Sequence, residues 1–99
     1  MFYNIYKTFL CVLYIIMFAM RDHIPIEFFL ELRDISMKIL ELSSIDSRAT
    51  IRFANNVILE CNLREKAARL PPKSRESVLK LISVFERVAF WDMPVHHQY

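Results

Sequence analysis

The order of apolar and polar residues predicts two long amphipathic helices, one over residues 26–42 and one over residues 74–90. In the first, charged residues recur at intervals of four and three, at Glu27, Glu31, Asp34, Lys38 and Glu41. In the second, apolar residues recur with the same helical spacing, at Val78, Leu81, Ile82, Phe85, Val88 and Ala89. Both spacings place residues of one kind on one side of a helix. The apolar arc of the first helix is wide enough to predict contacts on two sides, as in a dimer or a layered bundle.

Polar and proline-containing breaks mark where these helices are expected to begin and end. Pro25 suits the first turn of the first helix. Ser43 is predicted to cap the start of a further helix, with Asp46 three residues later, and that helix is expected to run to about Asn55. Ser74 follows two prolines and is predicted to be the N-cap of the last helix. The chain is therefore expected to contain helices joined by short connections.

The apolar spacing changes between residues 57 and 63. There the apolar residues alternate with polar ones, at Val57, Leu59, Cys61 and Leu63. A period of two with β-branched residues predicts a short strand. The preceding pair, Asn55 and Asn56, is predicted to end the helix, because asparagine tolerates the backbone angles that glycine usually takes there. Residues 64–69 are then expected to form a solvated, charged link, with phosphate contact as the alternative.

Residues 2–20 form the most apolar segment, and three interpretations of it are open. An apolar run of this length is typical of a buried helix, here in the core of a dimer. A membrane anchor is the second possibility, because Lys7 can extend its ammonium group to the membrane surface. A secretory signal is the third, although the end of the run lacks the small residues of a cleavage site.

The composition predicts one small domain, residues 1–92, followed by a flexible tail at residues 93–99. The 99 residues contain no glycine, which argues against phosphate-binding loops and dinucleotide-binding folds. Hydrophobic residues make up 55 % of the chain, more than one small domain is expected to bury, so a partner chain or a membrane is expected. The net charge of +2 is too small to indicate nucleic-acid binding by itself, although Lys73, Arg75, Lys80 and Arg87 make the last helix locally basic.

No arrangement of residues predicts catalysis, a cofactor or a metal ion. The two cysteines, Cys11 and Cys61, are fifty residues apart, and His96 and His97 lie in the predicted tail. This spacing does not give a zinc site. Cys11 and Cys61 are both expected to be buried in the apolar core. The chain is therefore not expected to be an enzyme.

Seven residues across the middle of the chain carry a resemblance to a known family. They are Leu42, Ser43, Ile51, Ala54, Leu59, Cys61 and Arg64, within a serine-preceded helix, two amides and an extended Leu-x-Cys-x-Leu-Arg stretch. This pattern resembles FlhD, the flagellar master-regulator subunit of enteric and related bacteria. The resemblance extends weakly back to Ile5 and Tyr6, and forward to Leu70 and Ser74-Arg75, so it covers most of the chain.

The resemblance implies an all-α fold, with one short extended segment near residues 57–63, that forms an intertwined homodimer. It also implies a cytoplasmic transcriptional co-regulator of flagellar or related genes. In that family FlhD acts with FlhC, which carries the zinc cysteines and most of the DNA affinity, and the complex recruits RNA polymerase. The equivalent of Cys61 lies near the dimer axis and can form an interchain disulfide, and Ser74 and Arg75 are candidates for contact with DNA or with the FlhC-type subunit.

The chain departs from the family pattern in a missing glycine, a shorter link between Cys61 and Leu70 and a different tail. These differences put the flagellar promoter specificity in question. The alternative is a small inner-membrane protein, anchored by residues 2–20, whose helical domain binds a partner.

Overall fold

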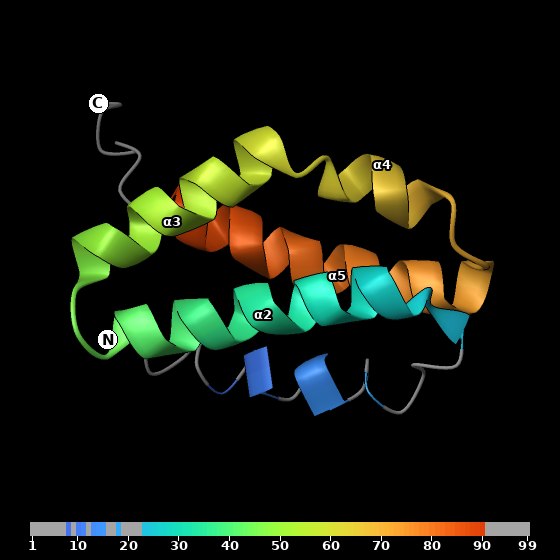
Figure 1. The fold of residues 1–99 in the computed structure, drawn as a ribbon, viewed down its shortest axis with the longest axis horizontal. Coiled ribbons are helices and arrows are strands. Elements are labelled where there is room, and N and C mark those ends of the chain that lie inside the picture. The colour runs from blue at the N-terminus through green and yellow to red at the C-terminus, as the bar shows by residue number, and fades with distance from the viewer. Residues whose placement is uncertain (1–7, 9, 12, 16–17, 19–22, 91–99) are drawn as a thin grey trace.

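The computed structural model describes residues 8, 10–11, 13–15, 18 and 23–90, and the described part of the chain is helical with no strand (Figure 1). This arrangement confirms the predicted all-α class. The helices are α2 (Ile26–Ser43), α3 (Ser47–Glu60), α4 (Leu63–Ala68) and α5 (Pro72–Ala89), preceded by helical residues between 8 and 18.

The helices pack side by side around one core. Helix α3 packs against both α2 and α5, and α4 packs against α5. In Figure 1 the α3–α4 pair runs along one edge of the molecule, α2 runs along the other, and α5 lies behind them. The N-terminal helical residues cover α2 from below in this view, and the rings of Tyr14 and Phe18 lie 6.3 and 5.9 Å from that of Phe29.

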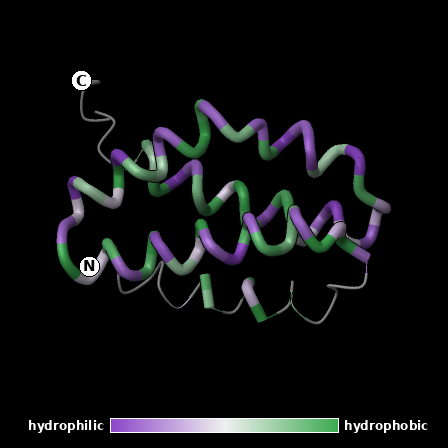
Figure 2. The backbone as a smooth tube through the Cα atoms, in the orientation of Figure 1, coloured by the Kyte–Doolittle hydropathy of each residue, from purple (hydrophilic) through white to green (hydrophobic). Residues whose placement is uncertain are grey.

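The core is built from the apolar rows of α2 and α5, and Figure 2 shows how these apolar positions alternate with polar ones along each helix. The predicted apolar row of α5 is confirmed, because every residue of it is at most 3 % exposed. Leu10 and Leu13, at 1 % and 6 % exposure, join this core from the N-terminal segment. Leu10 and Leu13 therefore stabilise their own chain, whereas Ile15, at 66 % exposure, faces away from this core.

The predicted strand at residues 57–63 is wrong. Helix α3 continues through Val57 to Glu60. Val57 is 7 % exposed and Leu59 is 73 % exposed, although the alternating pattern placed them on the same side. The buried residues of α3 are Thr50, Ala54 and Val57, at intervals of four and three, and packing of this row outweighs the local preference for a strand.

The break between α3 and α4 also differs from the prediction. Asn55 and Asn56 lie inside α3, and the left-handed backbone expected of an asparagine occurs at Asn62, with φ 50° and ψ 44°. Asparagine is one of the few residues that adopt this conformation at low cost, so it takes the place of glycine here. The charged link predicted after it is the short helix α4, not an irregular segment.

Three predicted helix starts are shifted. Asp46, not Ser43, is the N-cap of α3, and its carboxylate accepts hydrogen bonds from the backbone N–H groups of Arg48 and Ala49 at 2.9 and 3.3 Å. Ser43 is the last residue of α2. Pro25 is the N-cap of α2 and Pro71 is the N-cap of α5, so Ser74 lies within the first turn of α5. A carboxylate accepts more strongly than a hydroxyl from N–H groups at the positive end of a helix, which explains why Asp46 is the cap.

Other predictions concern the two ends of the chain. Cys11 was expected to be buried and is exposed. Most of residues 2–20, and all of residues 93–99 with His96 and His97, lie outside the described residues. Within the described residues, no helix has both the length and the apolar character needed to cross a membrane.

Candidate functional site

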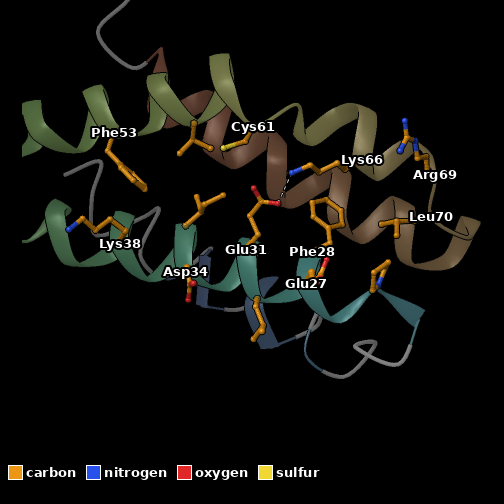
Figure 3. Close-up of a pocket in the computed structure, with 14 residues that line it drawn as sticks. Glu27, Phe28, Glu31, Asp34, Lys38, Phe53, Cys61, Lys66, Arg69 and Leu70 are labelled. Atoms are coloured by element: carbon orange, nitrogen blue, oxygen red, sulfur yellow. Dashed lines mark hydrogen bonds and ion pairs between the residues drawn. The ribbon is translucent and has the colours of Figure 1, made fainter.

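A groove of about 1150 Å³ lies between α2 on one side and α3 with α4 on the other (Figure 3). We call it the α2–α4 groove. It begins beside Pro25 and Leu70, where α4 has just ended, and reaches Lys38 and Phe53 at the far end. Its apolar lining consists of Phe28, Leu30, Ile35, Phe53, Val57 and Leu70. The groove therefore offers an apolar surface along most of the length of α2.

The two edges of this groove carry opposite charges. Glu27, Glu31 and Asp34 lie on the α2 edge, with Lys38 at its far end. Lys66 and Arg69 lie on the α4 edge. Lys66 Nζ donates to Glu31 Oε1 at 2.9 Å, and Figure 3 shows this ion pair crossing the groove. The charged row predicted along α2 therefore faces the basic edge of α4 as well as solvent.

Helix α4 is held in place by a second ion pair, made by Arg64. Its guanidinium binds both carboxylate oxygens of Glu86 on α5, with Nε and Nη2 each at 2.7 Å from an oxygen. This hydrogen bonding to a carboxylate raises the pKa of Arg64 and keeps it charged. Arg64, one of the residues of the family resemblance, thus connects the start of α4 to α5.

Cys61 lies at the junction of α3 and α4, where it lines the groove and is partly exposed. Burial, together with the negative charge of Glu31, raises the pKa of its thiol. The predicted core position is therefore only partly correct. An interchain disulfide at Cys61, which the resemblance implies, would require the groove to face its copy, and it stays a prediction.

The surroundings of Cys61 are expected to make its thiol react slowly with alkylating reagents, and Glu31 is expected to contribute to this effect. Because the thiolate is the reactive form, a raised pKa lowers its fraction at about pH 8 and slows alkylation by iodoacetamide. We expect Cys61 to be alkylated several times more slowly than the exposed Cys11, at about pH 8. In Glu31→Gln, the pH profile of Cys61 alkylation should shift to lower pH, because a negative charge that raises the pKa is lost. Peptide mapping by mass spectrometry measures both rates.

The matched control is Asp34→Asn, which removes a carboxylate from the same edge of the groove. Asp34 is not among the groups that shift the pKa of Cys61, so this variant should leave the profile in place. An unchanged profile in Glu31→Gln, or an equal shift in Asp34→Asn, would show that Glu31 does not control the thiol.

Ser74 and Arg75, the candidates for DNA or partner contact, lie in different surroundings. Ser74 is 0 % exposed, and its hydroxyl donates to the carbonyl oxygens of His23 and Pro71, at 3.1 and 3.3 Å. A buried hydroxyl has no access to DNA, so Ser74 instead ties the start of α5 to the segment before α2. Arg75 is partly exposed, and its Nη1 makes a long hydrogen bond of 3.5 Å to the carbonyl of Ala68. Of the two candidates, Arg75 alone lies at the surface.

The outer side of α5 carries a row of cations that the sequence analysis recognised only as local basic character. Lys73, Lys80 and Arg87 are all exposed and lie seven residues apart. Seven residues are almost two helical turns, so the three side chains share one face at intervals of roughly 10 Å. Within the described residues they take part in none of the ion pairs. The seven-residue interval was the signal that could have identified this α5 basic row.

In comparisons with known proteins, the chain matches no protein family, no curated protein and no solved structure.

Proposed function

We propose that this chain is an FlhD-like transcriptional co-regulator, which dimerises and acts with an FlhC-type DNA-binding subunit on flagellar or related genes. The observation that carries the proposal is the α5 basic row, three exposed cations on one helix face. Cations spaced along a helix suit the phosphates of a DNA backbone, which position a protein without reading bases. Arg75 is two residues after Lys73 and so lies roughly 200° around the helix, outside this row.

The size of this row also argues for a partner. Tight DNA binding typically uses about 6–10 phosphate contacts, whereas the α5 basic row offers three cations and the chain has a net charge of +2. One chain alone is therefore expected to bind DNA weakly. A DNA-binding subunit that supplies the remaining contacts fits the division of labour implied by the FlhD resemblance, with recruitment of RNA polymerase by the whole complex.

A second exposed surface supports dimerisation. Ile26 and Met37 on α2 are 63 % and 59 % exposed, and Ile15 in the N-terminal segment is 66 % exposed. These apolar side chains belong to the two segments that the sequence predicted for a dimer core. Packing of this face against a second copy would remove apolar surface from water that the single chain leaves exposed.

A gel-shift titration tests the proposed division of labour. The chain alone should not shift a promoter fragment at nanomolar concentration in physiological salt, and addition of an FlhC-type subunit should produce a specific, salt-sensitive shift. A shift by this chain alone at nanomolar concentration would contradict the proposal. A chain that pellets with membranes until detergent is added, and has no effect on DNA with or without the subunit, would favour the inner-membrane alternative.

The dimer face gives a separate prediction. Met37→Glu places a charge among the exposed apolar side chains of the proposed face and should weaken self-association at least about tenfold, because dimerisation would bury that charge. Sedimentation equilibrium measures the dissociation constant. The control is Leu59→Glu, since Leu59 is 73 % exposed on α3 and outside the proposed face. Equal dissociation constants in both variants, or a folded monomer for the unmodified chain at micromolar concentration, would show that this face is not the interface.

A further inference from the structure

We propose that the α2–α4 groove is a docking site for an amphipathic α-helix of a partner protein, with acidic residues along one edge of that helix and basic residues along the other. This site lies apart from the α5 basic row. It adjoins the proposed dimer face on α2, because Leu30, which lines the groove, is one helical turn after Ile26. It does not depend on the proposed role in transcription.

The dimensions of the groove suit a helix. Its lining on α2 runs from Pro25 to Lys38, which is about 20 Å along the helix axis, or between three and four turns. Its volume of about 1150 Å³ exceeds the roughly 300–1,000 Å³ that is typical of small-molecule sites. Phe28, Phe53 and Leu70 are spread along this length, so a row of apolar side chains at helical spacing would find contacts from end to end.

The charges of the two edges define the chemistry of the occupant. Glu27, Glu31 and Asp34 on α2 would pair with a basic edge, and Lys66 and Arg69 on α4 would pair with an acidic edge. A helix with one kind of charge on both sides of its apolar row would meet like charge along one edge of the groove. A helix with mixed edges meets opposite charge on both sides, and charge complementarity of this kind determines which partner binds.

The ion pair that crosses the groove is compatible with docking. The side chains of Lys66 and Glu31 are 43 % and 29 % exposed, and a solvent-exposed pair of this kind contributes little to stability. A bound helix can therefore separate the two groups and supply each with a new counter-charge. Cys61 lies beside this pair in the lining, so a docked helix would cover its thiol.

Three synthetic peptides of about 18 residues test the proposal, each with leucines at helical spacing. One has glutamates along one edge and lysines along the other, one has glutamates on both edges, and one has lysines on both. The mixed-edge peptide should bind saturably in isothermal titration calorimetry, and each single-charge peptide at least about tenfold more weakly. At saturation, alkylation of Cys61 by iodoacetamide should slow about tenfold, while alkylation of Cys11, which does not line the groove, should stay unchanged.

A charge reversal on the protein makes the test specific for the groove. In Lys66→Glu with Arg69→Glu, both edges become acidic, so the peptide with lysines on both edges should bind more tightly than the mixed-edge peptide. The matched control, Arg48→Glu with Arg52→Glu, makes the same change in net charge on the exposed side of α3 and should keep the original order. If the Lys66 and Arg69 double variant loses helicity in circular dichroism, Arg69→Glu alone neutralises the α4 edge and should reduce the preference for the mixed-edge peptide.

Four outcomes would overturn the proposal. Three of them are no saturable binding of the mixed-edge peptide, binding that leaves alkylation of Cys61 unchanged, and an unchanged peptide preference after charge reversal at the α4 edge. The fourth is the Cys61–Cys61 disulfide that the family resemblance predicts. Its formation under mild oxidation, lost in Cys61→Ser and retained in Cys11→Ser, would assign the groove to a second copy of the chain.

Discussion

Replacement of Phe85 by alanine is expected to lower the free energy of unfolding by about 3–5 kcal/mol. Phe85 is 0 % exposed and is one of the largest fully buried side chains described in the chain. Its removal costs the transfer free energy of the ring and leaves a cavity that the surrounding helices fill only in part. Because domains of this kind are stable by only about 5–15 kcal/mol, the loss is a large part of the total. Urea unfolding followed by circular dichroism measures it.

Phe90→Ala is the matched control for this prediction. Phe90 stands at the C-cap of the same helix and is 44 % exposed, so the same truncation should cost less than about 1 kcal/mol. The slope of the unfolding free energy against urea should be similar in both variants, because both expose similar surface when they unfold. Equal losses of stability in the two variants would mean that α5 does not supply the core as the structure indicates.

Helices α2 and α5 could be predicted from the sequence because each carries its own evidence. Both are amphipathic over 18 residues, and a helical period sustained for that length has few alternatives. The residues of the predicted α5 row, such as Leu81 and Phe85, are the ones that the structure buries. Local patterning and tertiary packing agree in these two helices.

The segment around Cys61 could not be predicted in the same way. Val57 to Leu63 satisfies a strand pattern over seven residues, and only the packing of Ala54 and Val57 in the core shows that α3 continues. The left-handed turn at Asn62 depends on where α3 ends, so an error about the end of the helix became an error about the turn. Short apolar runs of this kind are ambiguous until their neighbours in space are known.

The two candidate surfaces differ in how far the sequence reveals them. The α5 basic row lies on a single helix, and its seven-residue spacing can be read from the sequence. The α2–α4 groove brings together Glu31 and Lys66, which are 35 positions apart and meet only because the chain folds back on itself. The sequence showed each charge as part of a solvated stretch, and the structure shows that they form the two edges of one groove.

Reversal of the α5 basic row is expected to weaken strongly the binding of DNA by the complex with an FlhC-type subunit. In Lys73→Glu, Lys80→Glu, Arg87→Glu, three possible phosphate contacts become repulsive, which should weaken binding by roughly 100-fold or more in physiological salt. The slope of log affinity against log salt should fall by about three, since each phosphate contact contributes roughly 0.9 to it. Helicity and dimerisation should be unchanged, because all three side chains are exposed. Gel shifts over a range of salt concentrations measure both quantities.

The matched control distinguishes the position of these charges from their number. Arg48→Glu with Arg52→Glu, set beside Lys80→Glu with Arg87→Glu, makes the same change in net charge at exposed positions on α3. If DNA contacts α5, this control variant should keep most of the affinity for DNA and nearly the whole slope of log affinity against log salt. The reason is that long-range effects between exposed charges are largely screened beyond roughly 10 Å at moderate salt. Equal losses in the two variants would mean that the complex responds only to net charge. Full affinity in the α5 variant would mean that DNA does not lie along α5, and the observation that carries the proposed function would be lost.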